Sequence, residues 1–412
     1  MRVAVIGTGT AGLGAAYLLS RTHDVEVFEQ DGRVGGHTNT IPYTEPGGRR
    51  LALDTGFIVH NRENYPNLVR LFGELGVATQ DSEMSFSVAC ERCGLEYSGA
   101  RPWMQGGNLT SPAFLPLLRE IVRFMRTAPR AAAERDDETL RAFADREGYS
   151  AAFRAHFLVP LTASIWSTPP AQTGDFPARY AIRFFENHGM LRFRRFRWRT
   201  VAGGSDVYVR AILDRLPGRV HTGRGVRGVR RDADGVVLRT DGHEPVRFDA
   251  VVVATHPDQA LALLDDPTDD ERRLLGAFAY TENETILHTH DGLLPRRRSA
   301  RAAWNYRIMD CRSPAPTLTM TYDLNRLQRL PTDRHYLVTL NRGIEIPEEH
   351  VIERLSYAHP RYTTESLRAQ GQLHRIAGAG RTWYCGAWQG HGFHEDGFAS
   401  AVRVARGLGV RW

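Results

Sequence analysis

The strongest constraint on the fold lies at the start of the sequence, where a strand pattern leads directly into a glycine-rich loop. Residues 2–6 are a nearly continuous apolar run, which is typical of a parallel strand buried on both faces. Gly7, Gly9 and Gly12 follow with G-x-G-x-x-G spacing, and the residues after them are rich in Ala and Leu, as in a helix packed on a sheet. Glu29 ends the next expected strand. In this context the glycine spacing predicts a dinucleotide-binding βαβ unit.

Each glycine of the loop has a separate expected role. Gly7 permits the tight turn, Gly9 lets the backbone approach a diphosphate, and Gly12 lets the helix pack closely on the strand. The helix that begins near Ala11 would present free N–H groups and a partial positive charge to the anion. We expect Glu29 to accept hydrogen bonds from the adenosine ribose.

A second glycine pair favours FAD over NAD as the dinucleotide. Gly35 and Gly36 bring another stretch of backbone against the diphosphate, and Arg33 is placed to meet phosphate. A plain NAD domain does not need these contacts. The further cofactor contacts that we expect are Gln30, His37 and Thr38 in the same region, and Thr55, Gly56 and Phe57 in a turn that reaches the isoalloxazine ring.

Together with three later motifs, these features resemble the flavin-containing amine oxidase superfamily, which has the glutathione-reductase-like FAD fold. The resemblance covers nearly the whole chain. Its later anchors are Val201-Ala202-Gly203-Gly204-Ser205, Val226, and Cys385-Gly386-Ala387 followed by Glu395-Asp396-Gly397. The resemblance implies non-covalent FAD and a backbone contact from Val226 to the adenine side. It also implies contacts to the ribityl chain and pyrimidine from Gly386, Glu395, Asp396, Gly397 and Phe398.

Within the superfamily, four segments resemble a narrower group, the predicted bacterial NAD/FAD-binding amine-oxidase-like proteins associated with cyclopropane fatty acid synthases. These segments are residues 60–67, 84–87, 94–99 and 392–397. The substrate class that this resemblance implies is the acyl chains of lipids.

The chain departs from the superfamily pattern at two points. Amine oxidases commonly place a lysine near flavin N5, and this sequence contains no lysine. Amine oxidation by that route, and the fast reaction with oxygen that accompanies it, are therefore in doubt. The usual Gly-Asp of the C-terminal flavin strand is Gly386-Ala387 here, so one cofactor contact must come from elsewhere.

Strand patterns in residues 2–29, 219–257 and 382–408 predict an α/β fold, in which a Rossmann-like FAD-binding domain carries an inserted α+β substrate domain. We expect the FAD-binding domain to comprise residues 1–56, 201–257 and 376–412. The substrate-binding domain would comprise residues 57–200 and 258–375, with a helical subdomain at about 112–168. Apolar residues at helical spacing in 112–128 support the subdomain, and alternation in 280–345 predicts an antiparallel sheet.

The candidate substrate-side residues follow the flavin-contacting turns. A base is needed only if a proton leaves the substrate together with the hydride. The candidates are His60, Asn61 and His394 for catalysis, and Tyr65, Trp198 and His391 for substrate binding. For each histidine, a structural bond to a backbone carbonyl is the competing interpretation.

Arginine supplies all 53 basic residues, and the formal net charge is +6. Residues 190–200 interleave arginines with Phe193, Phe196 and Trp198. Nucleic acid binding is disfavoured because this segment leads directly into the Gly203-Gly204 motif. A strand that lines the substrate channel fits better. Arginine patches here and at 296–298, with the helix at 112–128, suggest peripheral contact with an anionic membrane.

Targeting and cysteine patterns set expectations for the cellular compartment. Met1 leads directly into the first strand and no run approaches a membrane span, so we expect a cytoplasmic protein, with the inner face of the membrane as a place of peripheral contact. The four cysteines fit a reducing compartment. Cys90 and Cys93 have the spacing of half a zinc site, but no second pair at matched spacing follows. We therefore expect no metal site, and a role for this pair stays open.

Three functions remain open at this stage. The first is an FAD-dependent dehydrogenase, desaturase or oxidase that transfers a hydride from a small apolar substrate, such as a fatty acyl chain or phospholipid, to flavin N5. The second is an FAD-dependent double-bond isomerase, which returns the hydride to the same molecule. The third is a non-catalytic lipid-binding protein that keeps FAD as a structural part.

Overall fold

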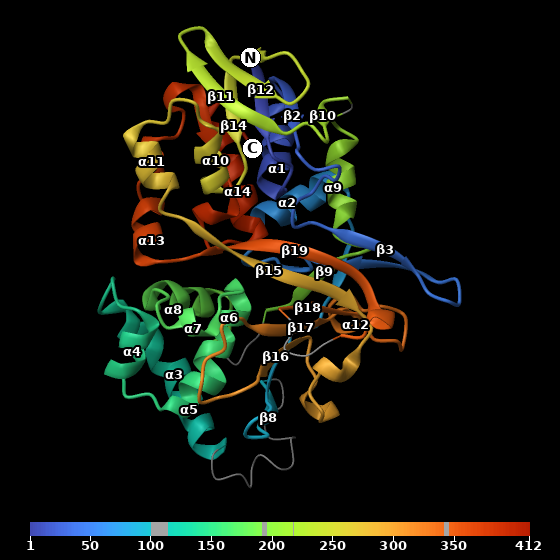
Figure 1. Cartoon of the computed structure of the whole chain (residues 1–412), viewed down its shortest axis with the longest axis vertical. Helices are drawn as coiled ribbons and strands as arrows, with labels where there is room; N and C mark the ends of the chain where they lie inside the picture. The colour runs from blue at the N-terminus through green and yellow to red at the C-terminus, as the bar shows by residue number, and fades with distance from the viewer. Residues whose placement is uncertain (100–113, 192–195, 217, 342–345) are drawn as a thin grey trace.

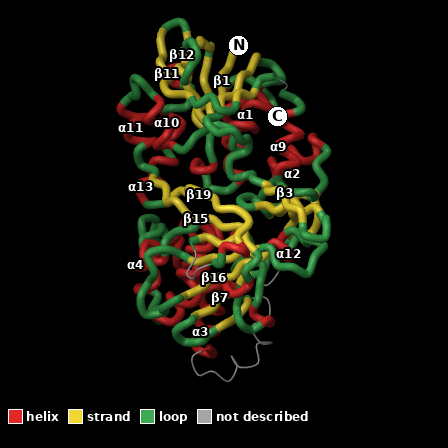
Figure 2. Tube along the Cα trace, turned by 45° about the vertical axis from the view of Figure 1, so that its right-hand side comes forward, coloured by secondary structure: helices red, strands yellow, loops and turns green. Residues whose placement is uncertain are grey.

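The structure, a computed structural model, describes residues 1–99, 114–191, 196–216, 218–341 and 346–412. The molecule is elongated, with both chain termini in its upper half (Figure 1). Two long strands, β15 (Ala279–His288) and β19 (Val351–Arg361), cross the waist between the upper and the lower half, and Figure 2 shows the same crossing from another side.

A parallel sheet forms the centre of the upper half. Its strand order is β10 (Val220–His221), β2 (Asp24–Phe28), β1 (Arg2–Ile6), β14 (Ala250–Val253) and β20 (Thr382–Tyr384). In the register, Val5 lies opposite Val27 on one side and Val252 on the other. All three side chains are fully buried, because layers cover both faces of the sheet.

Helices cover one face of this sheet. They are α1 (Thr10–Leu19), α2 (Pro66–Leu75), α9 (Asp206–Leu213) and α14 (His394–Gly407). Helices α1 and α14 pack closely, since a Cβ added at Gly14 would lie 2.6 Å from the ring of Phe398. On the other face lie the small antiparallel sheet of β11 (Val226–Asp232), β12 (Gly235–Thr240) and β13 (Val246–Phe248), and helices α10 (Pro257–Leu263) and α11 (Asp269–Leu275). The predicted α/β class with a Rossmann-like domain is confirmed.

The lower half is built on a seven-stranded sheet. Its order is β19, β15, β18 (Leu337–Leu340), β17 (Thr319–Asp323), β16 (Trp304–Ile308), β7 (Phe86–Cys90) and β8 (Glu96–Ser98). Neighbouring strands are antiparallel except for β16 and β7, which run parallel. This agrees with the strand alternation seen in the sequence.

Helices cover the lower sheet on one side. They are α3 (Phe114–Ala133), α4 (Leu140–Arg146), α5 (Ala151–Phe153), α6 (Val159–Trp166), α7 (Pro170–Thr173) and α8 (Ala178–Asn187). A π-helical turn, Arg154–Leu158, joins α5 to α6 without a break. The core between sheet and helices is rich in aromatic residues, including fully buried Phe124, Phe143 and Phe153. Residues 112 and 113 of the expected helical subdomain lie outside the described residues.

Two small sheets and two short helices connect the halves. The sheets pair β3 (Thr40–Thr44) with β4 (Arg50–Asp54), and β5 (Val59–Asn61) with β9 (Trp198–Val201) and β6 (Thr79–Asp81); the helices are α12 (Leu324–Leu327) and α13 (Thr364–Gln370). The fully buried carboxylate of Asp54 accepts hydrogen bonds from Thr40 Oγ1, the Ser205 backbone N–H and Gln328 Nε2, at 2.5, 2.8 and 2.8 Å. These bonds tie β4 to Ser205, which follows the Gly203-Gly204 motif, while burial raises the pKa of Asp54 to about 7.

Among the helices that the structure describes, none combines the length and the apolar composition needed to cross a membrane.

Candidate functional site

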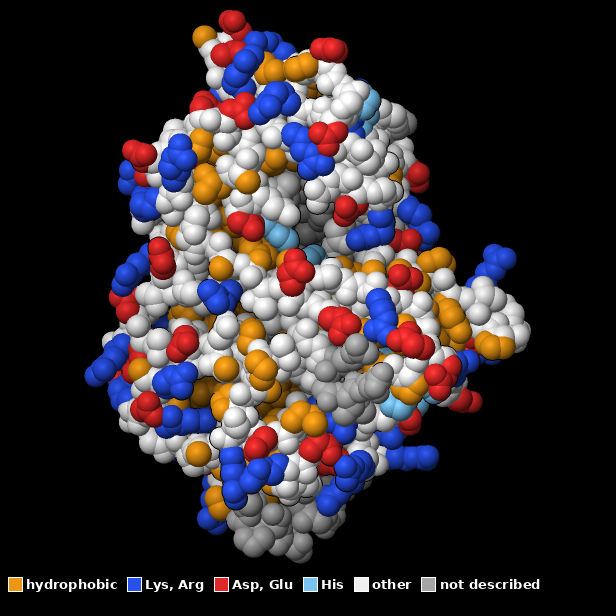
Figure 3. Space-filling view, viewed as in Figure 1, with side chains coloured by type: hydrophobic (Ala, Val, Ile, Leu, Met, Phe, Trp, Pro, Cys, Tyr) orange, Lys and Arg blue, Asp and Glu red, His pale blue; other side chains and the backbone are white. Residues whose placement is uncertain are grey.

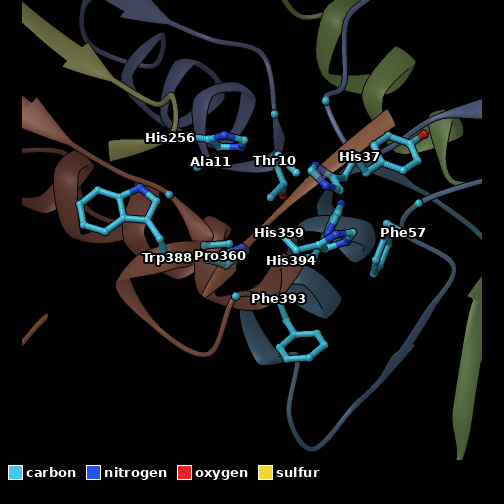
Figure 4. Close-up of a pocket in the computed structure, with 18 of the residues that line it drawn as sticks. Thr10, Ala11, His37, Phe57, His256, His359, Pro360, Trp388, Phe393 and His394 are labelled. Atoms are coloured by element: carbon cyan, nitrogen blue, oxygen red, sulfur yellow. The ribbon is translucent and has the colours of Figure 1, made fainter. Parts of the chain in front are cut away.

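A cavity of about 580 Å³ opens at the carboxyl ends of the parallel strands. Its upper wall consists of the residues that follow β1, β2 and β14, which is where ligands bind in open α/β sheets. From there the cavity extends down to the seven-stranded sheet. The space-filling view shows a recess in the upper half with histidine side chains at its edge (Figure 3), and Figure 4 shows the centre of the cavity.

The glycine loop after β1 leaves backbone exposed to the cavity. Gly7 has φ +97, and a Cβ at Gly12 would lie 1.9 Å from the Gly7 carbonyl oxygen, so neither position accepts a larger residue. A Cβ at Gly9 would meet nothing within 4 Å. Gly9 is also the N-cap of α1, and no side chain caps the helix. The free N–H groups of the first turn are therefore available to an anion.

A second glycine turn closes against the first. A Cβ at Gly36, where φ is +57, would lie 3.0 Å from the Gly9 Cα. The cavity at this point is thus bounded by backbone from two loops and by Thr10 and Ala11 of α1. This is the cradle that a dinucleotide diphosphate needs.

Glu29 lies at the adenosine end of the cavity together with Gln30 and Val226. Glu29 Oε2 accepts a hydrogen bond from the Thr8 backbone N–H at 2.9 Å and contacts the Thr8 hydroxyl. Glu29 Oε1 accepts from the backbone N–H of Asp31 at 3.1 Å. The carboxylate is held in place beside the cavity, as binding of ribose hydroxyl groups requires.

Arg33 serves its own loop and does not line the cavity. Its guanidinium donates to the carbonyl oxygens of Thr38 and Gly36 at 3.0 and 2.7 Å. Gly35 also lies behind the cavity wall, with its N–H donating to Thr8 Oγ1 at 3.3 Å. The tight turn aims these carbonyl groups at the guanidinium, and the phosphate contact expected of Arg33 stays a prediction.

The predicted flavin-ring turn and the C-terminal motif meet at the centre of the cavity. Thr55, Gly56, Phe57, Gly386 and His394 all line it. The rings of Phe57 and His394 are stacked, with centroids 3.9 Å apart (Figure 4). His394 Nε2 lies 2.9 Å from Thr38 Oγ1. Burial lowers the pKa of His394 to about 3, so its ring is neutral near pH 7.

The four residues after His394 lie one layer behind the cavity. Glu395 accepts from the backbone N–H groups of Asn67 and Leu68 at 3.1 and 3.0 Å and from Asn67 Nδ2 at 2.6 Å. Asp396 Oδ2 accepts from the Phe393 backbone N–H at 3.0 Å, which caps α14. Gly397 packs on Thr10, and Phe398 packs in the core against Gly14. These residues hold α14 against α1 and α2, and their implied cofactor contacts stay a prediction.

Three further histidines lie around the centre of the cavity: His37, which was predicted only as a cofactor contact, and His256 and His359, which were not predicted. His37, predicted as a cofactor contact, stacks on Tyr357 at 4.8 Å and lies 5.4 Å from His359. His256 stacks on Tyr280 at 4.0 Å. Figure 4 shows all of these histidines directed toward the same space as His394.

These three rings are neutral near pH 7, because burial lowers each pKa, that of His359 to about 4. His256 could have been found from the sequence, because it lies three residues after the buried strand β14, but nothing in the sequence marks His359, which lies within β19.

The predicted catalytic pair, His60 and Asn61, is not brought to the cavity. His60 is buried with its ring 5.3 Å from that of Phe72, and burial lowers its pKa to about 4. Asn61 Oδ1 accepts from the Asn64 backbone N–H at 2.7 Å and so orders the turn before α2. Of the predicted substrate contacts, Tyr65 and Trp198 line the cavity.

His391, the third predicted substrate contact, does not line the cavity. Its carbonyl oxygen accepts from Trp166 Nε1 at 2.9 Å, and its ring lies 4.5 Å from that of Tyr180.

The lower part of the cavity is apolar and aromatic. It is lined by Tyr65, Met84, Ser164, Ile165, Trp166, Ser167, Phe184, His188, Met190, Trp198, Trp304, Tyr322 and Leu340. Within the described ranges, this part of the wall has no carboxylate and no arginine. An ammonium group bound here would have no counter-ion from these residues, and burying an unpaired charge is costly.

A second cavity of about 640 Å³ adjoins the lower part and is strongly basic. Met84 and Trp198 line both cavities. The second cavity is lined by the five arginines Arg197, Arg298, Arg301, Arg326 and Arg329, against the two acids Asp81 and Glu83. Arg326 pairs with Glu83 at 2.9 Å and Arg197 with Asp81 at 3.8 Å. No described carboxylate pairs with Arg298 or Arg329.

Comparison with known proteins gives a family match over most of the chain. The family described as flavin containing amine oxidoreductase matches residues 10–290. A short stretch is 58% identical over 41 residues to protoporphyrinogen oxidase 2, chloroplastic/mitochondrial, of Arabidopsis thaliana. That stretch spans 10% of this chain and 8% of the plant protein.

Solved structures resemble the whole chain in fold. Putrescine oxidase bound to putrescine has a TM-score of 0.74 at 16% identity, with 100% of both chains covered. A fatty acid isomerase from P. acnes that produces CLA has a TM-score of 0.69 at 17% identity, with 98% of both chains covered. At these identities the likeness concerns the fold.

Proposed function

Since the chain belongs to the flavin-containing amine oxidoreductase family and is an FAD-dependent oxidoreductase, we propose that its substrate is an anionic molecule with an apolar chain, of the fatty acyl or phospholipid class. The observation that carries this proposal is the lining of the lower cavity, which is apolar and aromatic and shares the wall residues Met84 and Trp198 with a cavity lined by five arginines. The five arginines would repel a small amine, which is a cation at neutral pH.

The described residues fit FAD along the whole upper wall. The glycine loops and the N-terminus of α1 would hold the diphosphate, Glu29 the ribose, and the turns at Gly56 and Gly386 the ring system. When bound, FAD supplies an acceptor for a hydride from a carbon atom of the substrate.

The side chains of the cavity contribute exclusion of water and orientation. Trp166, Trp304 and Tyr322 place large apolar surfaces around the substrate space, and a dry site favours a close approach of the reacting carbon. The buried histidines stay neutral, so they orient polar atoms by hydrogen bonding and add no net charge. His394 is fixed for this by Phe57 and Thr38.

The second cavity would bind the anionic end of the substrate. Guanidinium groups bind carboxylate and phosphate through paired hydrogen bonds, and Arg298 and Arg329 are exposed at its rim. A carboxylate or phosphate placed there would direct the attached chain past Met84 and Trp198 toward the flavin space. The same arginines would favour peripheral contact with an anionic membrane from which such a substrate is taken.

The test is anaerobic mixing of the FAD-loaded protein with candidate substrates, followed by the visible absorption of the flavin. We expect fatty acyl substrates to bleach the flavin, and putrescine and cyclohexylamine to leave it unchanged. Bleaching by the amines, with none by acyl compounds, would overturn the proposed substrate class. Turnover that gives a product of unchanged mass with no acceptor consumed would identify double-bond isomerisation, and bound FAD with no spectral response to any acyl compound would point to a non-catalytic role.

A further inference from the structure

Four potential metal ligands converge in the lower half, away from the flavin cavity. They are Cys90, Cys93, His156 and Cys311, and their ligand atoms all lie within 4.8 Å of one another. In the sequence only Cys90 and Cys93 are neighbours, and the absence of a second pair led to the expectation of no metal site. That expectation did not allow for ligands supplied singly, and the fold brings His156 and Cys311 from two other segments to the same point.

Cys90 and Cys93 lie on a tight turn with the spacing of a zinc-binding half-site. Cys90 ends β7, and the turn leads into β8. The N–H of Gly94 donates to the Cys90 carbonyl oxygen at 3.0 Å, and Gly94 has φ +70, which glycine adopts without strain. The C-x-x-C-G turn therefore holds both thiols on one side of the chain.

His156 presents one ring nitrogen to the thiols and engages the other in the helix. Its Nδ1 lies 3.0 Å from the Ala152 carbonyl oxygen, which only accepts, so Nδ1 carries the proton and Nε2 has a free lone pair. Nε2 lies 3.4 Å from Cys93 Sγ. A histidine that ligates a metal typically has its other nitrogen fixed in this way. His156 also lies in the π-helical turn, a distortion that often occurs at functional positions.

Cys311 reaches the cluster because β16 runs parallel to β7. Ile308, the last residue of β16, lies opposite Cys90 in the register. The Glu91 backbone N–H donates to the Ile308 carbonyl oxygen at 2.9 Å, and Arg92 pairs with Asp310 at 3.0 Å. These contacts keep the segment after β16 beside the turn that bears Cys93.

We propose that these four residues form a structural Zn²⁺ site. A tetrahedron with Zn–S bonds of about 2.3 Å has ligand–ligand edges of about 3.8 Å, so the cluster needs to contract by at most about 1 Å from its 4.8 Å limit. Three thiolates and one imidazole complete four-coordination, which leaves no position open for substrate and marks the site as structural. A disulfide would pair only two of the three thiols.

The site would fix two elements that also form the substrate wall. The helix that carries His156 continues through α6 to Trp166, which lines the flavin cavity about 15 Å away at 1.5 Å per residue. Strand β16 begins at Trp304, another wall residue, and ends just before Cys311. Zinc would therefore hold the far ends of both elements against β7.

The test is the metal content of the full-length protein, purified with its FAD from zinc-supplemented medium and measured by mass spectrometry of the elements. We expect about one zinc per chain, and a loss of at least about tenfold in zinc content for Cys93→Ser and for His156→Ala. His243→Ala, which changes an exposed histidine elsewhere, is the matched control and should retain the metal. FAD content, read from visible absorption, checks independently that each variant folds and is not expected to change.

Cobalt substitution of the unaltered protein gives a second measurement. Tetrahedral Co²⁺ bound by three thiolates should show intense d–d bands and thiolate charge-transfer absorption, which stoichiometric Zn²⁺ should abolish. Protein without zinc and without this spectrum would overturn the proposal. A disulfide between two of the three cysteines in the purified protein would also overturn it. Retention of zinc by both Cys93→Ser and His156→Ala would do the same.

Discussion

Replacing Gly9 by alanine should separate cofactor binding from folding. The backbone at Gly9 has φ −64 and ψ 178, which alanine adopts without strain, and the added methyl group meets no atom within 4 Å. The polypeptide should therefore fold normally. However, Gly9 lines the cavity where the two glycine loops come together, so the methyl group would occupy the space through which a diphosphate approaches the backbone.

The size of the effect follows from the hydrogen bonds that the diphosphate would lose. A hydrogen bond to a charged group contributes about 1.5–3 kcal/mol. Displacing the diphosphate from one or two N–H groups would cost about 2–5 kcal/mol, and at about 1.4 kcal/mol per factor of ten this weakens FAD binding roughly 30- to 3,000-fold. The unfolding temperature of the FAD-free protein should stay within about 2 °C of that of the unaltered chain, since surface substitutions usually change stability by less than about 0.5 kcal/mol.

The assay is titration of FAD-free protein with FAD, followed by flavin fluorescence, together with thermal unfolding by circular dichroism. Gly47→Ala is a matched control, because its Cβ also meets nothing within 4 Å and it lies outside the cavity. Gly12→Ala should fail differently, by loss of folding, because its Cβ would lie 1.9 Å from a backbone oxygen. Unchanged FAD affinity in Gly9→Ala would refute the placement of the diphosphate at this loop.

Three further outcomes are expected. Glu395→Ala should lower the free energy of unfolding by about 2–5 kcal/mol without loss of FAD, because it removes the acceptor for two backbone N–H groups at the start of α2. Loss of FAD at unchanged stability would argue for a direct cofactor contact. His394 has a folded pKa of about 3 against 6.5 unfolded, so between these values only the unfolded state takes up the proton, and stability decreases as the pH is lowered. His394→Gln should reduce that slope, measured by denaturant unfolding, by about 1.4 kcal/mol per pH unit, and an unchanged slope would contradict a buried neutral ring. Met84→Glu should raise the KM for an anionic acyl substrate at least about tenfold by like-charge repulsion, whereas Met84→Leu should not; equal effects would exclude passage of the anion beside this residue.

The cofactor half of the site could be predicted because its determinants are local. Gly7, Gly9 and Gly12 have their roles set by a turn between β1 and α1, and Glu29 follows at the end of the next strand. All of these positions meet the cavity or pack directly behind it. Sequence spacing alone determines such a unit, since the parallel strands and the helix between them fix one another.

The substrate half could not be predicted to single residues, because one step along a strand reverses the direction of a side chain. Val59 of β5 lines the cavity, and its neighbour His60 points to the opposite face and into the core. The sequence identifies the segment, but the face that is turned to the cavity depends on pairing with β9 from more than a hundred residues away. For the same reason His359 on β19 gave no signal, because β19 reaches the cavity through its pairing with β15.

The cysteine cluster shows the same dependence on long-range pairing, and it has a mechanical consequence. Strands β7 and β16 are neighbours in the sheet although more than two hundred residues separate them, and the proposed zinc site lies at the end of this pairing. The four ligands converge only in the folded chain, so the binding free energy of zinc stabilises the folded state, and the metal acts on the strand that carries Trp304 and on the helix that leads to Trp166. The substrate wall is thus held at one end by the proposed metal site and meets the FAD cradle at the other. Removing the metal should therefore disturb the lower half before the parallel sheet, since the FAD cradle is formed by elements that do not contact the cluster.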